Sequence, residues 1–480
     1  MALCVGFGGG CTKPSGQDSG GSGPRVLVFG IDGGTWDVAR VMMDEGELPN
    51  LKKLYDSGIR GVLESRHPAI SPVVWSTIFT GKSHEVHGVE NWKTSQSSHR
   101  AVKAVWDISS GADLPTSVFN VPSTWPATEV DGVMLSGFPL SGSTIAGNTG
   151  DVISAGDAAA GKLTGCYTVN KDAIVAQISS LGIGEWSAYF EIEVRNRPNW
   201  VAQMRIMRLE DDKFYVTPCY RVDDGMNMSF PPEVRARVDE ELGEPYIPEG
   251  PGWSKHAEPD TPNYLYAHLV QVARNQTRAV QMFLGDPWRL LIYINTLVDR
   301  VSHPYWAYSQ PDNYDGLDRE KAAMYKDAVR DAYRETDIHL GDLIDSIEGE
   351  FYTVIASDHG FHSSKNKKMF IGTHNFDGVF LVSGPGLEGV DADRVFIEDI
   401  APTVLYLLEL PVGRDMKGKV IPEVAAAVGR PVTVIATYEG DGREGSTDPV
   451  DAKTWLQLQT MGYVDPDEPA PTKSGKEKKN

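Results

Sequence analysis

The sequence predicts an α/β protein with a mostly parallel sheet, helices on both faces of that sheet, and a β-rich cap inserted into the chain. Buried apolar stretches at Arg25–Ile31, Trp288–Asp299 and Tyr352–Gly360 are typical of strands that are covered on both sides. Helical patterns separate these stretches, as in parallel sheets whose strands are joined by crossover helices. Between about residues 140 and 285 the pattern changes to an alternation of apolar and polar side chains, which predicts antiparallel strands.

The composition is that of a large globular protein with an acidic surface. The chain has 480 residues, of which 41% are hydrophobic and 23% charged, and its formal net charge is -21. Such a charge repels the phosphate backbone of nucleic acids, so we expect no nucleic-acid partner. No apolar stretch reaches the ~20 residues that a transmembrane helix requires.

Residues 1–24 differ from the rest of the chain. The segment MALCVGFGGGC is small and apolar, and a flexible polar tether follows it. This order resembles the end of a bacterial lipoprotein signal, in which Cys11 would carry the lipid anchor. We therefore expect a periplasmic or membrane-tethered protein, and the alternative is a disordered leader.

The first part of the core is expected over residues 25–139. The strand Arg25–Ile31 runs into a turn at Asp32-Gly33-Gly34, where glycine permits a tight bend. Short helices are predicted at Leu48–Gly58 and Trp75–Gly81, and further strands at Ser117–Asn120 and Gly132–Ser136.

The inserted cap is expected over residues 140–285. Its predicted strands are Trp186–Val194, Gln203–Glu210 and Lys213–Val222. Cys166 and Cys219 both fall inside this segment, where they either form one disulfide or remain buried free thiols.

The second part of the core is expected over residues 286–440. It contains the strand Trp288–Asp299, a charged helix from about Asp318 to Ile347, the strand Tyr352–Gly360 and a helix over 397–408. Residues 441–480 form an extension whose polar end is predicted to be disordered.

Chemistry-bearing residues follow the predicted strands. Three carboxylates stand at strand ends, which meet at one edge of a parallel sheet, and three histidines lie close to them in the sequence. These six residues are Asp32, Asp299, Asp358, His303, His359 and His374. Buried carboxylates repel one another unless a cation lies between them, and mixed oxygen and imidazole ligands favour zinc, manganese or iron over magnesium or calcium.

Ser71 is the candidate nucleophile. It precedes a predicted helix, whose backbone N–H groups favour an anion, and a bound metal lowers the pKa of a hydroxyl enough for attack at neutral pH. The alternative is that Ser71 is an ordinary helix N-cap.

Five motifs, taken in order, resemble the alkaline phosphatase superfamily. They are GIDGGTWD, ISPVVWSTIFTGKSHEVHGV, LVDRVSHPYW, SDHGFH and GTHNFDG. The branch they resemble most is the type I phosphodiesterase and nucleotide pyrophosphatase-like phosphohydrolases, over about residues 25–140 and 286–425.

The resemblance implies an alkaline-phosphatase-like fold and a two-metal phosphohydrolase. In that pattern Asp32, Ser71, Asp358 and His359 hold one divalent ion, and Asp299, His303 and His374 hold the other. Zinc is the first expectation for both ions and manganese the second. Ser71 would form a phosphoserine intermediate that water removes, with a phosphodiester or another small phosphate ester as substrate.

Two departures from the family pattern leave the substrate open. Val74 stands where nucleotide pyrophosphatases carry an asparagine that holds a phosphate oxygen, so the oxyanion contacts would come from the Ser71–Pro72 backbone, Lys82 or Asn91. The sulfatase signature is absent. A phosphomonoesterase, a phosphomutase and a non-catalytic binding lipoprotein are the alternatives.

Overall fold

The computed structural model of the chain describes residues 23–137, 145–146, 150–160, 171–194, 199–223, 226–248, 250 and 262–440. Cys11, Cys166 and the extension over 441–480 lie outside the described residues, as does all but the end of the expected leader. In the described part of the chain, no helix combines the length and the apolar character that crossing a membrane requires.

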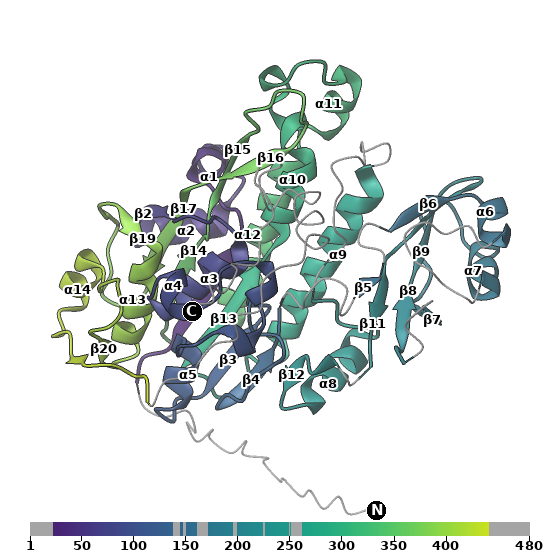
Figure 1. Cartoon of the computed structure of the whole chain (residues 1–480). Coiled ribbons are helices and arrows are strands. Elements are labelled where there is room, and N and C mark those ends of the chain that lie inside the picture. Colours follow the sequence, from purple (N-terminus) through teal and green to yellow (C-terminus); the bar gives the residue numbers. More distant parts are fainter. Residues whose placement is uncertain are drawn as a thin grey trace, which may run out of the picture.

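A ten-stranded mixed sheet forms the centre of the fold (Figure 1), in the order β12-β4-β3-β13-β1-β14-β17-β2-β18, with β19 also pairing with β2. The five neighbours β4, β3, β13, β1 and β14 are parallel, whereas β17 is antiparallel to both β14 and β2, and β12 is antiparallel to β4. The strands are β1 Val26–Ile31, β2 Ile59–Glu64, β3 Thr116–Phe119, β4 Gly132–Leu135, β12 Ser229–Phe230, β13 Leu290–Asn295, β14 Tyr352–Ala356, β17 Asp377–Ser383, β18 Val390–Asp391 and β19 Val395–Phe396. The predicted α/β class with a mostly parallel sheet is confirmed.

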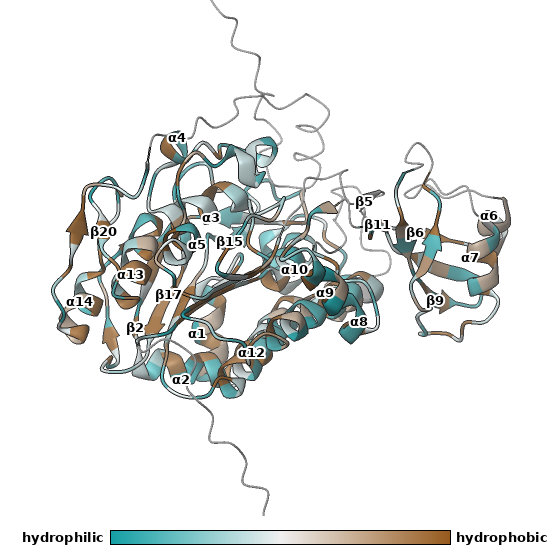
Figure 2. Cartoon of the chain, turned by 90° about the horizontal axis from the view of Figure 1, so that it is seen from below, coloured by the Kyte–Doolittle hydropathy of each residue, from teal (hydrophilic) through white to brown (hydrophobic). Residues whose placement is uncertain are grey.

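Helices cover both faces of this sheet. One face carries α1 Trp36–Asp44, α2 Pro49–Ser57, α9 Pro262–Gln281, α10 Leu297–Ser309 and α12 Ala328–Ser346; the other carries α3 Ser71–Thr80, α5 Val105–Ser110, α13 Ile400–Leu407 and α14 Pro422–Val428. Figure 2 shows β17 between α1 and α13.

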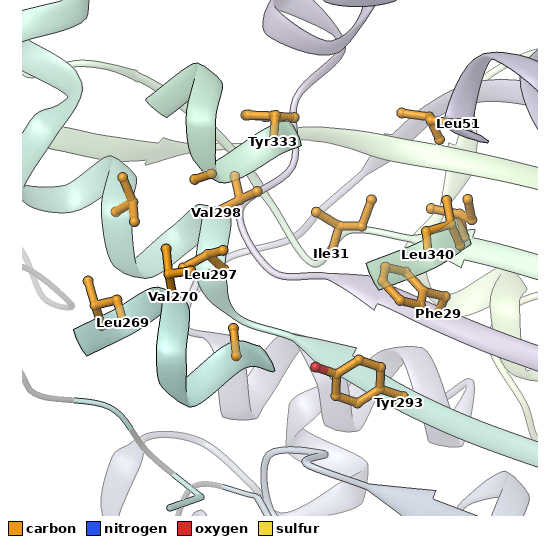
Figure 3. Packing of buried hydrophobic residues seen from close by; sticks show 14 of the residues in the cluster. Phe29, Ile31, Leu51, Leu269, Val270, Tyr293, Leu297, Val298, Tyr333 and Leu340 are labelled. Carbon is orange, nitrogen blue, oxygen red and sulfur yellow. The ribbon is translucent and has the colours of Figure 1, made fainter. Parts of the chain in front are cut away.

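Strand β1 supplies side chains to both hydrophobic layers, because successive residues of a strand point to opposite faces. Leu27, Phe29 and Ile31 belong to one buried cluster, and Val26 and Val28 belong to the other. Figure 3 shows Phe29 and Ile31 in the first cluster, near Leu340 and Tyr333 of α12. This two-sided burial explains why the strand reads as a continuous apolar stretch.

Several predicted elements differ from those observed. The predicted helix Trp75–Gly81 is α3 Ser71–Thr80, and each of the predicted strands Gln203–Glu210 and Lys213–Val222 is two strands of different sheets.

Two further differences lie in the second part of the core. The stretch predicted as one strand to Asp299 ends as a strand at Asn295, and Leu297 begins helix α10. A short buried helical turn is as apolar as a buried strand, so composition did not separate the two. The predicted helix from Asp318 to Ile347 is two helices, α11 Arg319–Tyr325 and α12, and its expected apolar residues Leu340 and Leu343 are buried.

Antiparallel sheets occur within residues 145–221 (Figure 1). One has the order β6-β10-β9 and the other β5-β11-β8-β7, and they share a hydrophobic cluster separate from the core. Their elements are β5 Ile145–Ala146, β6 Asp151–Ile153, α6 Ala155–Ala160, α7 Lys171–Ile178, β7 Phe190–Ile192, β8 Ala202–Met204, β9 Ile206–Glu210, β10 Lys213–Val216 and β11 Cys219–Arg221. The later part of the 140–285 segment packs with the core, since β12 joins the large sheet and α8 Glu233–Leu242 and α9 line its cluster.

Smaller elements complete the described chain. They are α4 His84–His87, the hairpin β15 Gly360–Ser363 and β16 Gly372–Asn375, the pair β20 Val412–Gly413 and β21 Val434–Ile435, and the 3-10 turns η1 Trp92–Thr94, η2 Ser97–His99, η4 Pro311–Asn313 and η5 Ile397–Asp399.

Candidate active site

The structure brings all seven sequence-predicted site residues together at the carboxyl edge of the large sheet. Asp32 follows β1, Asp358 and His359 follow β14, and Asp299 and His303 lie four residues apart on α10. Ser71 begins α3, and His374 lies on β16. Only His374 is partly exposed; the other six are at most 2% exposed.

Ser71 does not act as an N-cap. The capping position of α3 is Ile70, and Ser71 is the first helical residue. Its hydroxyl instead lies in the site, with Oγ 3.4 Å from Oδ1 of Asp32 and 3.4 Å from Nε2 of His359. The side chain therefore faces the carboxylate and the imidazole rather than the helix terminus.

Backbone and indole N–H groups fix the two carboxylates nearest to Ser71. The Nε1 of Trp75 donates to Oδ2 of Asp32 at 3.1 Å, and the backbone N of Gly33 donates to Oδ1 of Asp358 at 3.2 Å. Each carboxylate thus has one oxygen held by the protein. Its other oxygen faces His359, at 3.7 Å from Nε2 for Asp32 and 3.2 Å for Asp358.

Backbone carbonyls set the tautomers of two histidines. Nδ1 of His359 lies 3.2 Å from the carbonyl oxygen of Gly360, and Nδ1 of His374 lies 2.9 Å from that of Ala69. A carbonyl only accepts, so each Nδ1 carries the proton and each neutral ring presents an Nε2 lone pair to the site. Metal-binding histidines are commonly oriented by this type of contact.

Two buried carboxylate oxygens of the site face imidazole nitrogens. Oδ1 of Asp299 and Oδ2 of Asp358 are buried without a hydrogen bond of good geometry, although Nε2 of His374 lies 3.3 Å from the first and Nε2 of His359 lies 3.2 Å from the second. Buried acceptors left facing one another are costly. Divalent cations relieve this arrangement, so the residues present fit metal ions.

Two groups in the described chain bring potential ligand atoms within 4.8 Å of one another. One contains Asp32, Asp358 and His359, and the other contains Asp299, His359 and His374. His359 lies in both groups, whereas the family resemblance assigns it to one ion. His303 borders the second group, with Nε2 3.4 Å from Oδ1 of Asp299.

The electrostatics reflect three carboxylates in one buried space. Burial raises the pKa of Asp32, and the charges of Asp358 and Asp299 raise it further. Burial and then the charge of Asp299 raise the pKa of Asp358 to about 7. Burial also acts to raise the pKa of Asp299, but His303 and His374 together hold it well below the usual value.

The histidines respond to the same surroundings. Burial lowers the pKa of His359, and the positive charge of a protonated His374 lowers it further. Burial acts in the same direction on His374, but its 3.3 Å contact with Asp299 and that residue's charge raise its pKa overall. Without a cation, the site therefore binds protons in place of one.

The β1–α1 turn is tied to the neighbouring strand ends. The backbone N of Asp299 donates to the carbonyl oxygen of Asp32 at 3.1 Å, and Gly34 N donates to Oγ of Ser357 at 2.8 Å. Gly33 has φ +72°, and a Cβ there would meet the Asp299 backbone at 3.0 Å. Only glycine combines this left-handed conformation with such a close approach.

Other residues of the motifs pair elsewhere or serve the core. Lys82, a candidate oxyanion contact, lies two residues beyond the end of α3, and its ammonium group pairs with Asp415 at 2.7 Å and Glu439 at 2.8 Å. His87 is fully buried with Nε2 3.0 Å from Thr77 Oγ1, and burial lowers its pKa to about 3. Trp306 stacks on Phe361 in the core.

Sequence reasoning missed one contact of the site. It placed Trp75 at the start of a predicted helix, whereas the structure shows its indole N–H bound to Asp32. The available signal was the spacing, because Ser71 and Trp75 are four residues apart and share one helix face.

A mostly parallel α/β sheet with a serine hydroxyl beside a buried carboxylate and imidazole cluster defines a candidate metallohydrolase. The chain belongs to the type I phosphodiesterase / nucleotide pyrophosphatase family, whose model matches residues 26–378. It is therefore a hydrolase that acts on phosphate esters, and the resemblance indicated by the five motifs is confirmed.

Solved structures similar to the chain include sulfatases and a phosphonate hydrolase. BT4656, solved with D-glucosamine-2-N,6-O-disulfate as its substrate, is 14% identical, with 87% of this chain and 82% of that chain covered and a TM-score of 0.42. The putative sulfatase yidJ from Bacteroides fragilis is 11% identical (88% and 81% covered, TM-score 0.38). The phosphonate monoester hydrolase SpPMH from Silicibacter pomeroyi is 12% identical (85% and 77% covered, TM-score 0.38). No curated protein matches the chain.

Proposed function

We propose that this protein is a two-metal phosphodiesterase that cleaves small phosphate diesters through a phosphoserine intermediate on Ser71. The observation that carries the proposal is the position of the Ser71 hydroxyl, 3.4 Å from both a carboxylate oxygen of Asp32 and Nε2 of His359. A hydroxyl beside two groups with free lone pairs can lose its proton and attack phosphorus.

The proposed ions divide the seven residues into two sets. Asp32, Ser71, Asp358 and His359 would hold one ion, and Asp299, His303 and His374 the other, with zinc preferred and manganese as the second choice. When bound, such ions neutralise charge on the transferring phosphoryl group and lower the pKa of the hydroxyl. The charges agree, since three carboxylates and a serine alkoxide balance two divalent cations.

The protein's own residues would act in two steps. The proton of Ser71 Oγ goes to water, Oγ forms a bond to phosphorus while the bond from phosphorus to the leaving oxygen breaks, and that oxygen takes a proton back from water. Water then attacks the phosphoserine, which releases a phosphate monoester and restores the Ser71 hydroxyl. Burial of the site residues limits access of bulk water to the site, apart from the water molecule that attacks the phosphoserine.

The substrate preference rests on what surrounds Ser71. Val74 offers no hydrogen-bond donor at the position where the relatives' asparagine would hold a phosphate oxygen. The antiparallel insert is the segment that we propose to select the leaving group, since loops carried on a rigid scaffold usually set specificity.

The test combines metal content with turnover of two substrates. We expect about two zinc or manganese ions per chain, and faster hydrolysis of bis-p-nitrophenyl phosphate than of p-nitrophenyl phosphate. Ser71→Ala should lower kcat for the diester at least about a thousandfold. The matched control is Ser76→Ala on the same helix, whose hydroxyl only donates to the carbonyl oxygen of Pro72 at 2.6 Å.

Three outcomes separate the alternatives. Faster turnover of the monoester would establish a phosphomonoesterase. Metal-free protein, or diester turnover that survives Ser71→Ala, would contradict the proposal. Retention of the phosphoryl group on a second acceptor would indicate a mutase.

The proposed location is extracytoplasmic, with Cys11 as the acylated residue. Mass spectrometry of the protein from the membrane fraction should find an acylated N-terminal cysteine, and Cys11→Ser should release the protein. If Cys11 is unmodified in the protein from the membrane fraction, the proposed lipid anchor is contradicted, and the proposed reaction is unaffected.

A further inference from the structure

Two residues one helical turn apart each contact a different carboxylate oxygen of Asp32. Ser71 Oγ lies 3.4 Å from Oδ1, and Trp75 Nε1 donates to Oδ2 at 3.1 Å. Both residues lie on α3, where positions i and i+4 share a face. The indole therefore uses the carboxylate oxygen that points away from Ser71, and leaves the oxygen beside it available.

We propose that Trp75 is a positioning residue, which holds Asp32 so that only Oδ1 faces the cation and the Ser71 hydroxyl. The inference rests on the proposed two-metal function, because it concerns how one ligand of that site is presented. A carboxylate held at one oxygen binds a metal through the other, and loss of such an outer contact commonly weakens metal affinity 10- to 100-fold.

The indole has little freedom to move away from Asp32. Trp75 is fully buried, and its ring lies 5.8 Å from that of Phe79 in a stacked arrangement. On the other side it crosses β1 at Gly30, where a Cβ would lie 2.6 Å from Cη2 of the indole and would also collide with Ile294. Packing from both sides thus fixes the direction of the N–H bond.

The hydrogen bond decides which oxygen of Asp32 remains available. Asp32 is buried, its Oδ2 accepts from the indole N–H at 3.1 Å, and its Oδ1 lies 3.4 Å from Ser71 Oγ. Without the indole N–H, no donor among the described residues holds Oδ2, and the carboxylate is free to rotate away from Ser71.

The structure offers a matched control in the same hydrophobic layer. Trp106 is also buried. Its ring lies 5.3 Å from that of Phe79, the ring on which Trp75 stacks, but its Nε1 makes no hydrogen bond. Trp106→Phe therefore removes an indole of similar burial without removing a donor. Any loss common to the two variants reports packing alone.

The experiment measures zinc affinity by competition with a chromogenic chelator, together with kcat and KM for bis-p-nitrophenyl phosphate. Trp75→Phe should weaken zinc binding 10- to 100-fold at one of the two sites, the one that contains Asp32, and should leave the other site unchanged. It should lower kcat more than it changes KM, whereas Trp106→Phe should change zinc affinity less than threefold. Cobalt-substituted protein should show an altered visible spectrum in Trp75→Phe only.

A second variant keeps the test decisive if Trp75→Phe fails to fold. Incorporation of 3-benzothienylalanine at position 75 keeps the ring shape and replaces the N–H by sulfur. We expect the same loss of zinc affinity in that protein at wild-type thermal stability. If the benzothienylalanine protein has the zinc affinity and kcat of the wild type, the inference is overturned. If the wild-type protein itself binds no metal, the proposed function is overturned instead.

Discussion

The Nε2 atoms of His303 and His374 lie 3.1 Å apart in the candidate site. His374 donates its Nδ1 proton to the carbonyl oxygen of Ala69 at 2.9 Å, so its Nε2 is the ring atom that faces His303. Two imidazole nitrogens reach this distance when one of them is protonated or when both bind a cation. This relationship makes the pair a direct reporter of metal occupancy.

His374→Ala should remove one of the two metal ions. Removing a side chain that binds the metal directly should weaken metal affinity at least as much as removing a hydrogen-bond partner of such a side chain. We therefore expect the metal affinity of one site to fall at least about 100-fold. Elemental analysis after gel filtration should then find about one ion per chain instead of two. His84→Ala is the control, because that ring pairs with Glu85 at 3.3 Å near the far end of α3; unchanged stoichiometry in His374→Ala would contradict the assignment.

Gly33→Ala should destabilise the protein more than Gly46→Ala. Both glycines have positive φ, +72° and +80°, but a Cβ at Gly46 meets nothing within 4 Å, whereas one at Gly33 would meet Phe361 at 2.6 Å and Asp299. The left-handed conformation costs alanine about 1–2 kcal/mol at either position. Forcing the site apart at Gly33 should add about 1–3 kcal/mol.

Chemical denaturation in urea measures the free energy of unfolding of both glycine variants. Metal affinity then separates the effect on the site from the effect of backbone conformation. Gly33→Ala should also weaken metal affinity, because Gly33 N holds Asp358. Equal free energies of unfolding for the two variants would show that the close approach at Gly33 costs nothing.

Metal-free protein should lose stability relative to Asp358→Asn as the pH rises from about 6.5 to 8. The pKa of Asp358 is raised to about 7 in the folded state, from an ordinary value of 3.8. At this residue the folded chain therefore binds more protons than the unfolded chain, and the stability that Asp358 contributes falls as its proton leaves. The variant keeps the other titrating groups, so their shared effects cancel in the difference.

The expected change is on the order of 1 kcal/mol, measured as the free energy of unfolding with a chelator present. The lowered pKa values of the buried histidines act in the opposite direction between pH 6.5 and 8, so the difference from Asp358→Asn is the quantity to measure. With zinc bound, the trend should vanish or reverse, because metal competes with the proton on Asp358. A difference between the two proteins that stays constant or grows from pH 6.5 to pH 8 would contradict the prediction.

Cys219 is disulfide-bonded, and the predicted partner is Cys166, which lies outside the described residues. Proteolysis without reductant should yield one peptide pair linked through these two cysteines. Reduction should lower the melting temperature, since removing a native disulfide typically costs about 2–5 kcal/mol. Alkylation of Cys166 in the unreduced protein would contradict the pairing.

Much of the central sheet follows from local sequence patterns. The strand at Val26–Ile31 was predicted to within one residue, because burial on both faces requires an uninterrupted apolar stretch. The same reasoning failed after Asn295, where apolar residues continue into α10. The strand β17 is antiparallel to its neighbour β14, and strand direction depends on a connection that composition does not encode.

The sequence by itself determined the chemical inventory of this protein: three carboxylates after buried segments, histidines beside them and a serine at a helix start. The tertiary structure decided which of their atoms face one another. It placed His359 in both ligand groups, fixed His374 through Ala69 and bound Trp75 to Asp32. Residue type and spacing specify which groups can bind a cation or a proton, but orientation is set by packing and hydrogen bonds between segments that are distant in the chain.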